Sequence, residues 1–370
     1  MKIVVNISRV LVGCLFIFSG LVKAIDPLGL AYKMQEFFEV WAAGGFLPHV
    51  MDWLHVHALW FSLLMITLEV VLGVALLLGW RTKTVSFLLL LLMLFFTFLT
   101  SYVLFSGKIR ACGCFGDCIP LTPIQTFTKD IILSVLVLII LFGTKYIKPF
   151  LPGKVNAVLF TLSLLAVLGL QWYVLHHLPV KDCLPFKAGN NILELRKMPR
   201  DAVPDKYDYV FVYKKNGEAK EFKVSALPDS SWEFAERKQI LLEKGKNNIP
   251  LINDFIFTTA SGNDTTEAVL GQPGEYYILF VKEFNGDKDT WYGDFMKFSA
   301  ATQLPVYMVT GDRKKANEIF AKLGVVGFPV FTCDVTAIKT AARVTPTLYL
   351  MNGPVIKNKW SWEDAKTIVK

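Results

Sequence analysis

Charged residues are scarce in this chain: Asp, Glu, Lys and Arg make up 19% of its 370 residues, while 53% are hydrophobic. So little charge excludes an ordinary soluble protein of this length, in which about 25% of residues are charged. The apolar residues also gather in runs, each about long enough to cross a hydrocarbon core of about 30 Å as a helix. These runs are Ile3–Val22, Ala58–Trp80, Thr84–Phe105, Phe127–Gly143 and Val155–Leu175.

The run Phe127–Gly143 is the shortest, so the sequence predicts four to five transmembrane helices. After His177 the composition changes to Asp, Lys, Asn and Gly with short alternating runs, which is typical of water-soluble domains. We therefore expect a membrane α-helical bundle over residues 1–177, a linker with a β-hairpin and a helix over 178–245, and an α/β domain over 246–370.

The chain also lacks a glycine-rich loop that could cradle phosphate, and its net charge of +8 is spread along its length. No nucleic-acid partner is expected, and membrane lipid is the expected surrounding. Basic residues mark one side of the membrane, because Lys and Arg concentrate in cytoplasmic loops. They lie at the start of the chain and in two links: Lys2, Arg9, Arg81, Lys83, Lys145, Lys148 and Lys154. With five spans, the segment 106–126 and the tail would lie outside the cytoplasm, in the periplasm if the membrane is a bacterial inner membrane.

Cysteines are few, but three of the six lie together in the segment ACGCFGDC. Cys112 and Cys114 form a C-x-C pair, and the glycine between them permits the tight turn that a disulfide across one residue needs. Cys118 could act as a resolving thiol and Asp117 as a proton acceptor. A strained disulfide exchanges readily. A fixed disulfide and a zinc site are the alternatives, although a fourth zinc ligand is missing and no metal is expected.

Cysteines elsewhere add possible pairings. Cys183 and Cys333 lie on the same side of the predicted membrane as the cluster, and either could pair with it. Cys14 falls within the first span, where a small packing role is expected.

Glu69 is an acidic residue in the middle of the second span, where an isolated charge is costly. Arg9 lies on the first span at a similar expected depth, so the sequence predicts an Arg9–Glu69 pair. Such a pair could fix the helix register or bind a cofactor or proton. The five histidines fall at the predicted outer interface, where amphipathic rings are common.

Several stretches within residues 1–175 resemble a known group. RVLVGCLFIFSGLVKAIDPLGLAYKMQEFF, followed by LEVVLGVALLLGWRTKT, is similar to DoxX-like membrane proteins and to the methylamine-utilisation protein MauE. The shared features would be Arg9, the stretch Phe16–Pro27, Glu69 and the CGCFGD box. The resemblance implies thiol or sulfur redox chemistry coupled to quinone, with quinone bound near Glu69 and Arg9. A DoxX-like region with a long periplasmic tail resembles uncharacterised proteins of Bacteroidetes.

The tail shows its own patterns. YVFVYKKNGEAKEFKV predicts a β-hairpin around Asn216-Gly217, and WEFAERKQILLEKG predicts a charged helix. From about Ile249 a strand–helix–strand–helix–hairpin order resembles thioredoxin-like domains of the TlpA type, with Thr345-Pro346 where that fold has its cis-proline. The segment FNGDKDTWYGDF has no C-x-x-C, so the usual nucleophile is missing. The domain is expected to bind a partner beside Thr345 and Pro346, with Cys333 a packing residue.

Two functions remain open at this point. One is a quinone-linked thiol–disulfide oxidoreductase, in which Cys112, Cys114 and Cys118 exchange electrons with a periplasmic thiol protein. The other is a non-catalytic envelope scaffold whose tail binds a partner and whose cysteines are structural.

Overall fold

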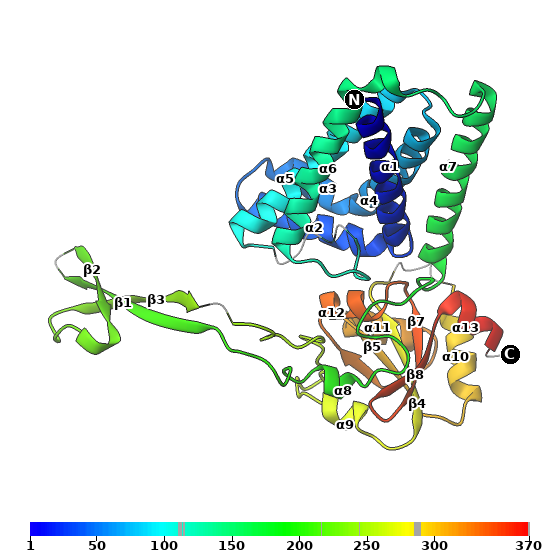
Figure 1. Cartoon of the computed structure of the whole chain (residues 1–370). Helices are drawn as coiled ribbons and strands as arrows, with labels where there is room; N and C mark the ends of the chain where they lie inside the picture. The colour runs from blue at the N-terminus through cyan, green and yellow to red at the C-terminus, as the bar shows by residue number, and fades with distance from the viewer. Residues whose placement is uncertain (110–112, 114, 216, 244, 285–289, 369–370) are drawn as a thin grey trace.

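The structure is a computed structural model and describes residues 1–109, 113, 115–215, 217–243, 245–284 and 290–368. Within these residues, five helices are long and apolar enough to cross a membrane, as expected. They are α1 (Lys2–Ala24), α4 (Ala58–Leu78), α5 (Thr82–Ser106), α6 (Pro123–Phe142) and α7 (Gly153–His176). They form the upper part of the molecule in Figure 1, with α7 at the edge of the bundle.

The uncertain fourth span is a full helix because its start lies four residues before the apolar run. The Thr122 hydroxyl accepts a hydrogen bond from the Gln125 amide, and the Gln125 side chain accepts one from the Thr122 amide. This reciprocal cap, with proline at the first helical position, fixes the N-terminus of α6. The helix is therefore 20 residues long.

The segment between the first two spans forms two helices that run across the end of the bundle: α2 (Pro27–Ala43) and α3 (Pro48–Val56). The Asp26 side chain accepts a hydrogen bond from the Gly29 amide and caps α2. Buried Met34, Phe37 and Phe38 hold α2 against the core of the bundle. This helix lies on the side of the bundle that faces the C-terminal domain.

Helices α1 and α4 approach closely because glycines line their contact. A β-carbon added at Gly13 would run into Leu77, and one at Gly73 would run into α1. Small residues let membrane helices pack backbone to backbone. The contact fixes the register, since it sets Gly20 beside Glu69.

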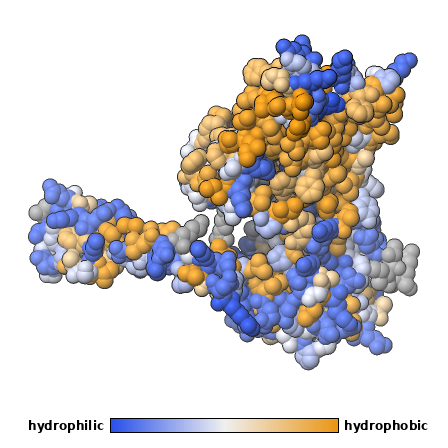
Figure 2. Space-filling model, in the orientation of Figure 1, coloured by the Kyte–Doolittle hydropathy of each residue, from blue (hydrophilic) through white to orange (hydrophobic). Residues whose placement is uncertain are grey.

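The outer surface of the bundle is apolar, and Figure 2 shows this as orange over the helices, with blue at the end far from the C-terminal domain. The C-terminal domain and the arm are largely blue in the same view. Together with the spans, this distribution defines a multi-pass membrane protein.

The C-terminal domain is built on a mixed sheet in the order β6-β5-β4-β7-β8. Strands β4, β5 and β6 are parallel to one another, whereas β7 is antiparallel to β4 and forms a hairpin with β8. The strands are β4 (Glu275–Val281), β5 (Val306–Thr310), β6 (Val330–Thr332), β7 (Thr347–Asn352) and β8 (Val355–Ser361).

Helices cover both faces of this sheet because its strands alternate between two apolar clusters. Ile278 and Phe280 point into one cluster, whereas Leu279 and Val281 point into the other. The first face carries α8 (Ile192–Leu195), α9 (Thr266–Leu270) and α12 (Val335–Ala341), and the second carries α10 (Tyr292–Ala301), α11 (Arg313–Lys322) and α13 (Trp362–Ile368). This sheet order, with helices on both faces, confirms the expected thioredoxin-like α/β domain. The Thr345–Pro346 bond is cis.

A separate arm projects sideways from the C-terminal domain (Figure 1). Its antiparallel sheet has the order β2-β1-β3, with β1 (Lys206–Lys215), β2 (Glu218–Lys223) and β3 (Glu233–Glu243). The expected hairpin is present. The prediction of a charged helix in WEFAERKQILLEKG is wrong, because this segment forms β3. Its backbone pairs with the free edge of β1, and the Phe234 ring contacts Tyr213 across the strands.

Candidate functional site

We define the cysteine loop as residues 113–118. Its described residues, Gly113 and Phe115–Cys118, lie where the membrane bundle meets the C-terminal domain. Cys112 and Cys114 fall outside the described residues. Gly113 has φ +71°, a conformation that glycine adopts readily, and it lies next to the side chain of Lys33 on α2. Gly116 lies against the backbone of Val22 near the end of α1.

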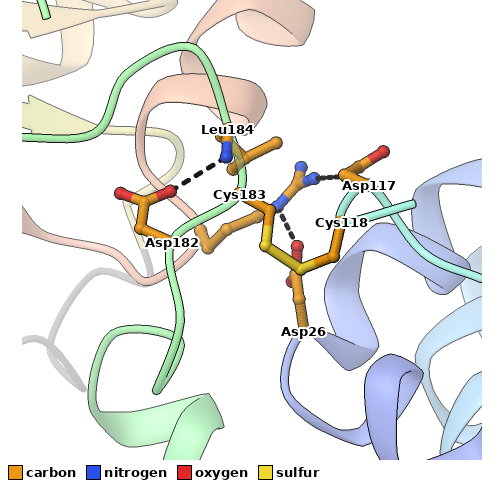
Figure 3. Close-up of a disulfide and its surroundings, with 7 residues drawn as sticks. Asp26, Asp117, Cys118, Asp182, Cys183 and Leu184 are labelled. Atoms are coloured by element: carbon orange, nitrogen blue, oxygen red, sulfur yellow. Dashed lines mark hydrogen bonds and ion pairs between the residues drawn. A yellow bond between two sulfur atoms is a disulfide. The ribbon is translucent and has the colours of Figure 1, made fainter. Parts of the chain in front are cut away.

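Cys118 forms a disulfide with Cys183, with Cα atoms 4.9 Å apart (Figure 3). This is one of the pairings that the sequence left open. Cys183 belongs to the segment that leads from α7 into the C-terminal domain. The bridge therefore ties the cysteine loop to that segment and closes a span of 65 residues. Cys118, expected as a resolving thiol, is thus already paired.

The segment beyond α7 is also held by polar contacts to the C-terminal domain. His177 Nδ1 lies 2.7 Å from an Asp364 oxygen, and Asp182 forms an ion pair with Lys359. Asp182 also accepts a hydrogen bond from the Leu184 amide at 3.1 Å (Figure 3).

Arg343 links the loop, the bundle and the C-terminal domain. Its Nη2 donates to Asp117 at 2.6 Å, and its Nε donates to Asp26 at 2.7 Å. In Figure 3 dashed lines join Asp26 and Asp117 to the same side chain, beside the Cys118–Cys183 disulfide. Burial alone would lower the pKa of Arg343, but the two carboxylates outweigh it and raise the pKa. Asp117, predicted as a proton acceptor, binds a permanently charged guanidinium.

Tyr32 of α2 provides an aromatic surface for cations of the C-terminal domain. Lys282, Lys339 and Arg343 lie 5.8, 5.1 and 5.4 Å from the centre of its ring. Lys282 also donates to the Tyr32 hydroxyl at 3.0 Å and to the Arg343 carbonyl at 2.6 Å. Burial lowers the pKa of Lys282 to about 8.

These contacts involve the face of the thioredoxin-like domain that carries the cis-proline. Lys282 follows β4 directly, and its amide donates to the Thr345 hydroxyl at 3.1 Å. Pro346 is buried and Thr345 is partly exposed. Partner binding at this pair stays a prediction, but the neighbouring Arg343 already contacts the membrane bundle.

Inside the bundle, Glu69 forms an ion pair with Lys23, and both side chains are 2% exposed. The predicted Arg9–Glu69 pair is therefore wrong. The glycine contacts place Glu69 level with Gly20, so that Lys23 reaches it. Arg9 instead donates to the carbonyls of Leu76 and Leu77 at the end of α4. Carbonyls in the last turn of a helix lack the usual amide donors four residues on, and a cation is favourable there. The Leu76 carbonyl also accepts from the Gly79 amide at 3.0 Å.

A second buried carboxylate lies close to this pair. Asp130 on α6 forms an ion pair with Lys129 and accepts a hydrogen bond from the Thr100 hydroxyl at 3.1 Å. Lys23 lies 4.8 Å from the centre of the Phe96 ring, and Lys129 lies 5.1 Å from that of Phe115 in the cysteine loop.

These side chains line a cavity of about 20 Å³, which is room for one water molecule. Charged groups at membrane depth usually face a functional cavity or path. The cavity therefore marks a polar site directly beneath the cysteine loop. Its lining residues are Leu15, Phe16, Ser19, Lys23, Glu69, Met93, Phe96, Phe115, Lys129, Asp130 and Leu133.

Sequence reasoning missed Lys23, Asp26, Tyr32, Asp130 and Arg343. Lys23 and Asp26 were within reach, because both belong to the stretch FSGLVKAIDP on which the family resemblance rests. Tyr32 and Arg343 give no local signal, since their role depends on how two distant parts of the chain dock. Across the described residues, no group of three or more His, Cys, Asp and Glu side chains could hold a metal.

Comparison with known proteins agrees with this architecture. Residues 1–143 match the family model of the methylamine utilisation protein MauE, and residues 207–244, in the arm, match a domain family of unknown function, DUF8463. The chain is 33% identical over 151 residues to Protein TlpB of Flavobacterium psychrophilum, a match that covers 40% of this chain and 37% of that protein. The chain thus matches little more than a third of the length of this curated relative. No solved structure matches.

Fold and comparisons together define a multi-pass membrane protein with a thioredoxin-like domain. Its membrane part is MauE-like, which confirms that part of the expected resemblance. The DoxX resemblance stays a prediction.

Proposed function

We propose that this protein is a thiol–disulfide oxidoreductase of the bacterial inner membrane, with its C-terminal domain in the periplasm and Cys112 and Cys114 as the exchanging pair. The observation that carries the proposal is the position of the cysteine loop. Phe115 lines a charged cavity in the bundle, whereas Asp117 is bound by Arg343 of the thioredoxin-like domain. The described residues of the loop therefore lie between the polar cavity of the bundle and the C-terminal domain. The MauE-like membrane part and the likeness to TlpB are consistent with this function.

The proposed reaction oxidises a dithiol in a periplasmic thiol protein. A thiolate of that partner attacks one sulfur of a Cys112–Cys114 disulfide, and the displaced cysteine leaves as a thiolate. The partner's second thiolate then attacks the mixed disulfide, so that the partner is oxidised and both loop cysteines become thiols. The Cys118–Cys183 bridge stays intact and holds the loop, so we assign it a structural role.

Reoxidation of Cys112 and Cys114 releases two electrons and two protons, and we propose a membrane quinone as the acceptor. A quinone bound at the cavity would take up both electrons and both protons. The residues fit its headgroup: Lys23 and Lys129 are donors for carbonyl oxygens, and Phe96 and Phe115 offer ring faces. The cavity itself holds about one water molecule, so it would have to widen to admit the headgroup. Arg9, which contacts the far end of α4, is not part of this proposed site.

The test is a trapping experiment in cells. In Cys114→Ser, the Cys112 thiolate can attack the disulfide of the oxidised partner, which reverses the proposed exchange, but no Cys114 thiol is left to displace the partner. Cys112 should therefore accumulate in a mixed disulfide with a periplasmic protein, which mass spectrometry after thiol blocking would identify. Cys333→Ser is the control, because Cys333 is buried with its pKa raised by burial, and should trap nothing. Absence of any covalent partner, together with a Cys112–Cys114 pair that never changes redox state, would refute the proposed thiol–disulfide oxidoreductase activity.

A scaffold is the second candidate, and the missing C-x-x-C favours it. In that case the cluster stays fully oxidised, and Cys114→Ser lowers the abundance of the protein without forming a mixed disulfide. The same trapping experiment therefore separates the two functions.

A further inference from the structure

The cis-proline face of the thioredoxin-like domain is docked on its own membrane bundle. Lys282, at the end of β4, contacts Tyr32 of α2, and Arg343, close to the cis-proline, contacts Asp26 and Asp117. We propose that this domain acts as a clamp within the chain, and that Arg343 is the positioning residue that holds the cysteine loop through Asp117. The inference rests on the proposed function, because it assigns a role toward the exchanging cysteines.

The geometry at Arg343 suits a clamp. The guanidinium is a planar fork, so it can bind two carboxylates at fixed angles, which a lysine ammonium cannot do. One carboxylate, Asp26, caps α2, and the other, Asp117, lies in the loop. The Arg343 side chain is only 7% exposed, and its Nη1 also donates to the Lys339 carbonyl at 3.1 Å. Two part-buried charge-assisted hydrogen bonds therefore connect the loop, through Asp117, to the start of α2, through Asp26.

The loop is held on both sides of Cys114. Asp117 is three residues after it and is followed by the disulfide-bonded Cys118, while Gly113 lies against Lys33 and Phe115 against Phe18. Of these contacts, the Asp117–Arg343 pair is the one made by a residue close to the cis-proline. A domain that needs no cysteines of its own can serve this purpose, which accounts for the absence of C-x-x-C in FNGDKDTWYGDF.

The experiment uses the full chain in native membranes, with two readouts. The first is the rate at which the Cys112–Cys114 disulfide re-forms after mild reduction. The second is the rate at which a maleimide alkylates the reduced loop thiols, which does not require turnover. Retention of the Cys118–Cys183 disulfide checks that each variant is folded.

Arg343→Met should slow re-formation about tenfold or more and speed alkylation by a similar factor, as expected for the loss of charge-assisted hydrogen bonds. Asp117→Asn leaves the Arg343–Asp26 contact in place and should give much of the same effect. The double variant should have the same re-formation and alkylation rates as Arg343→Met, because both changes break the same Asp117–Arg343 contact. Arg343→Lys should be intermediate, since it keeps the charge but loses the fork. Lys357→Met is the control: it breaks the exposed Lys357–Glu275 pair on the same domain and should change neither rate.

Wild-type rates in Arg343→Met and Asp117→Asn, or losses that simply add in the double variant, would overturn the clamp. If the wild-type protein itself never re-forms the disulfide, the proposed function fails instead. The alkylation rates would still show whether Arg343 restrains the loop.

Discussion

At the scale of single residues, the Lys23–Glu69 pair is the clearest consequence of placing charge in a membrane. Both side chains are almost fully buried, and neither would be stable there alone. Removing one partner of a buried pair costs about 3–5 kcal/mol, whereas replacing both can be nearly neutral. We therefore expect Lys23→Met and Glu69→Gln each to lower the thermal stability of the purified protein, and the double variant to be more stable than either.

Arg9 supplies the control for that prediction. It is bonded to carbonyls of α4, so combining Arg9→Gln with Glu69→Gln should give additive losses in unfolding temperature. Compensation between Arg9 and Glu69, and not between Lys23 and Glu69, would contradict the observed register.

The sequence was informative about Glu69 but not about its partner. An acid at mid-membrane had to be paired, which follows from the cost of burying charge. Which cation reaches it depends on the glycine contacts of α1 with α4, and the depth of each residue counted from the helix ends does not reveal these. The local sequence thus predicts that a buried carboxylate needs a cationic partner, whereas the identity of that partner depends on helix packing.

Lys282 makes the junction sensitive to pH. Its pKa falls from 10.5 to about 8 on burial, so between these values the docked protein binds fewer protons than the undocked one. Stability should then rise with pH from about 8 to about 10.5 and level off below about 8, where both forms are charged. Comparing the unfolding temperature of the wild type with that of Lys282→Met across this range should show a pH slope in the wild type that the variant has lost. Equal slopes in the two proteins would exclude Lys282 as the source.

At the scale of elements, the start of α2 serves both the bundle and the docked domain. Asp26 caps the helix and also binds Arg343, so Asp26→Ala should lose about 1 kcal/mol from the cap and more from the ion pair. Asp312, which caps α11 through the Lys315 amide at 2.9 Å, is the matched control and should show the cap effect alone. Unfolding temperatures of the two alanine variants measure the difference. Equal losses would mean that the Arg343 contact contributes little.

Elements were predicted best where one strong local signal decides them. The five spans follow from apolar runs, and the core strands of the C-terminal domain follow from short apolar runs bounded by turns. Strand β3 was predicted as a helix because Glu, Arg, Lys and Leu favour helices. It forms a strand because it pairs with the edge of β1, and the local sequence does not reveal this pairing. Helix α2 was missed because its apolar residues face other helices, and its signal, the Asp26-Pro27 cap, is short.

At the scale of the whole molecule, we expect the two ends of the membrane bundle to lie in different compartments. The Cys118–Cys183 disulfide and the docked domain lie at one end of the bundle, and disulfides persist in oxidising compartments. The basic links 81–83 and 144–154 lie at the other end, where lysine and arginine favour the cytoplasm. Five spans put the N-terminus with the basic links and the C-terminal domain with the disulfide.

The prediction is a C-terminal domain outside the cytoplasm. A reporter fused after Lys370 that folds only in the periplasm should be active, and a reporter that works only in the cytoplasm should be silent. Single cysteines placed at Lys83 and Lys357, in a chain whose Cys14, Cys112, Cys114 and Cys333 are replaced by serine, give an independent measure. A membrane-impermeant maleimide applied to cells with a permeable outer membrane should label position 357, which is exposed, but position 83 only after the inner membrane is opened. The reverse pattern would put the cysteine loop in a reducing compartment, where the Cys118–Cys183 bridge could not persist, and the proposed exchange chemistry would fail with it.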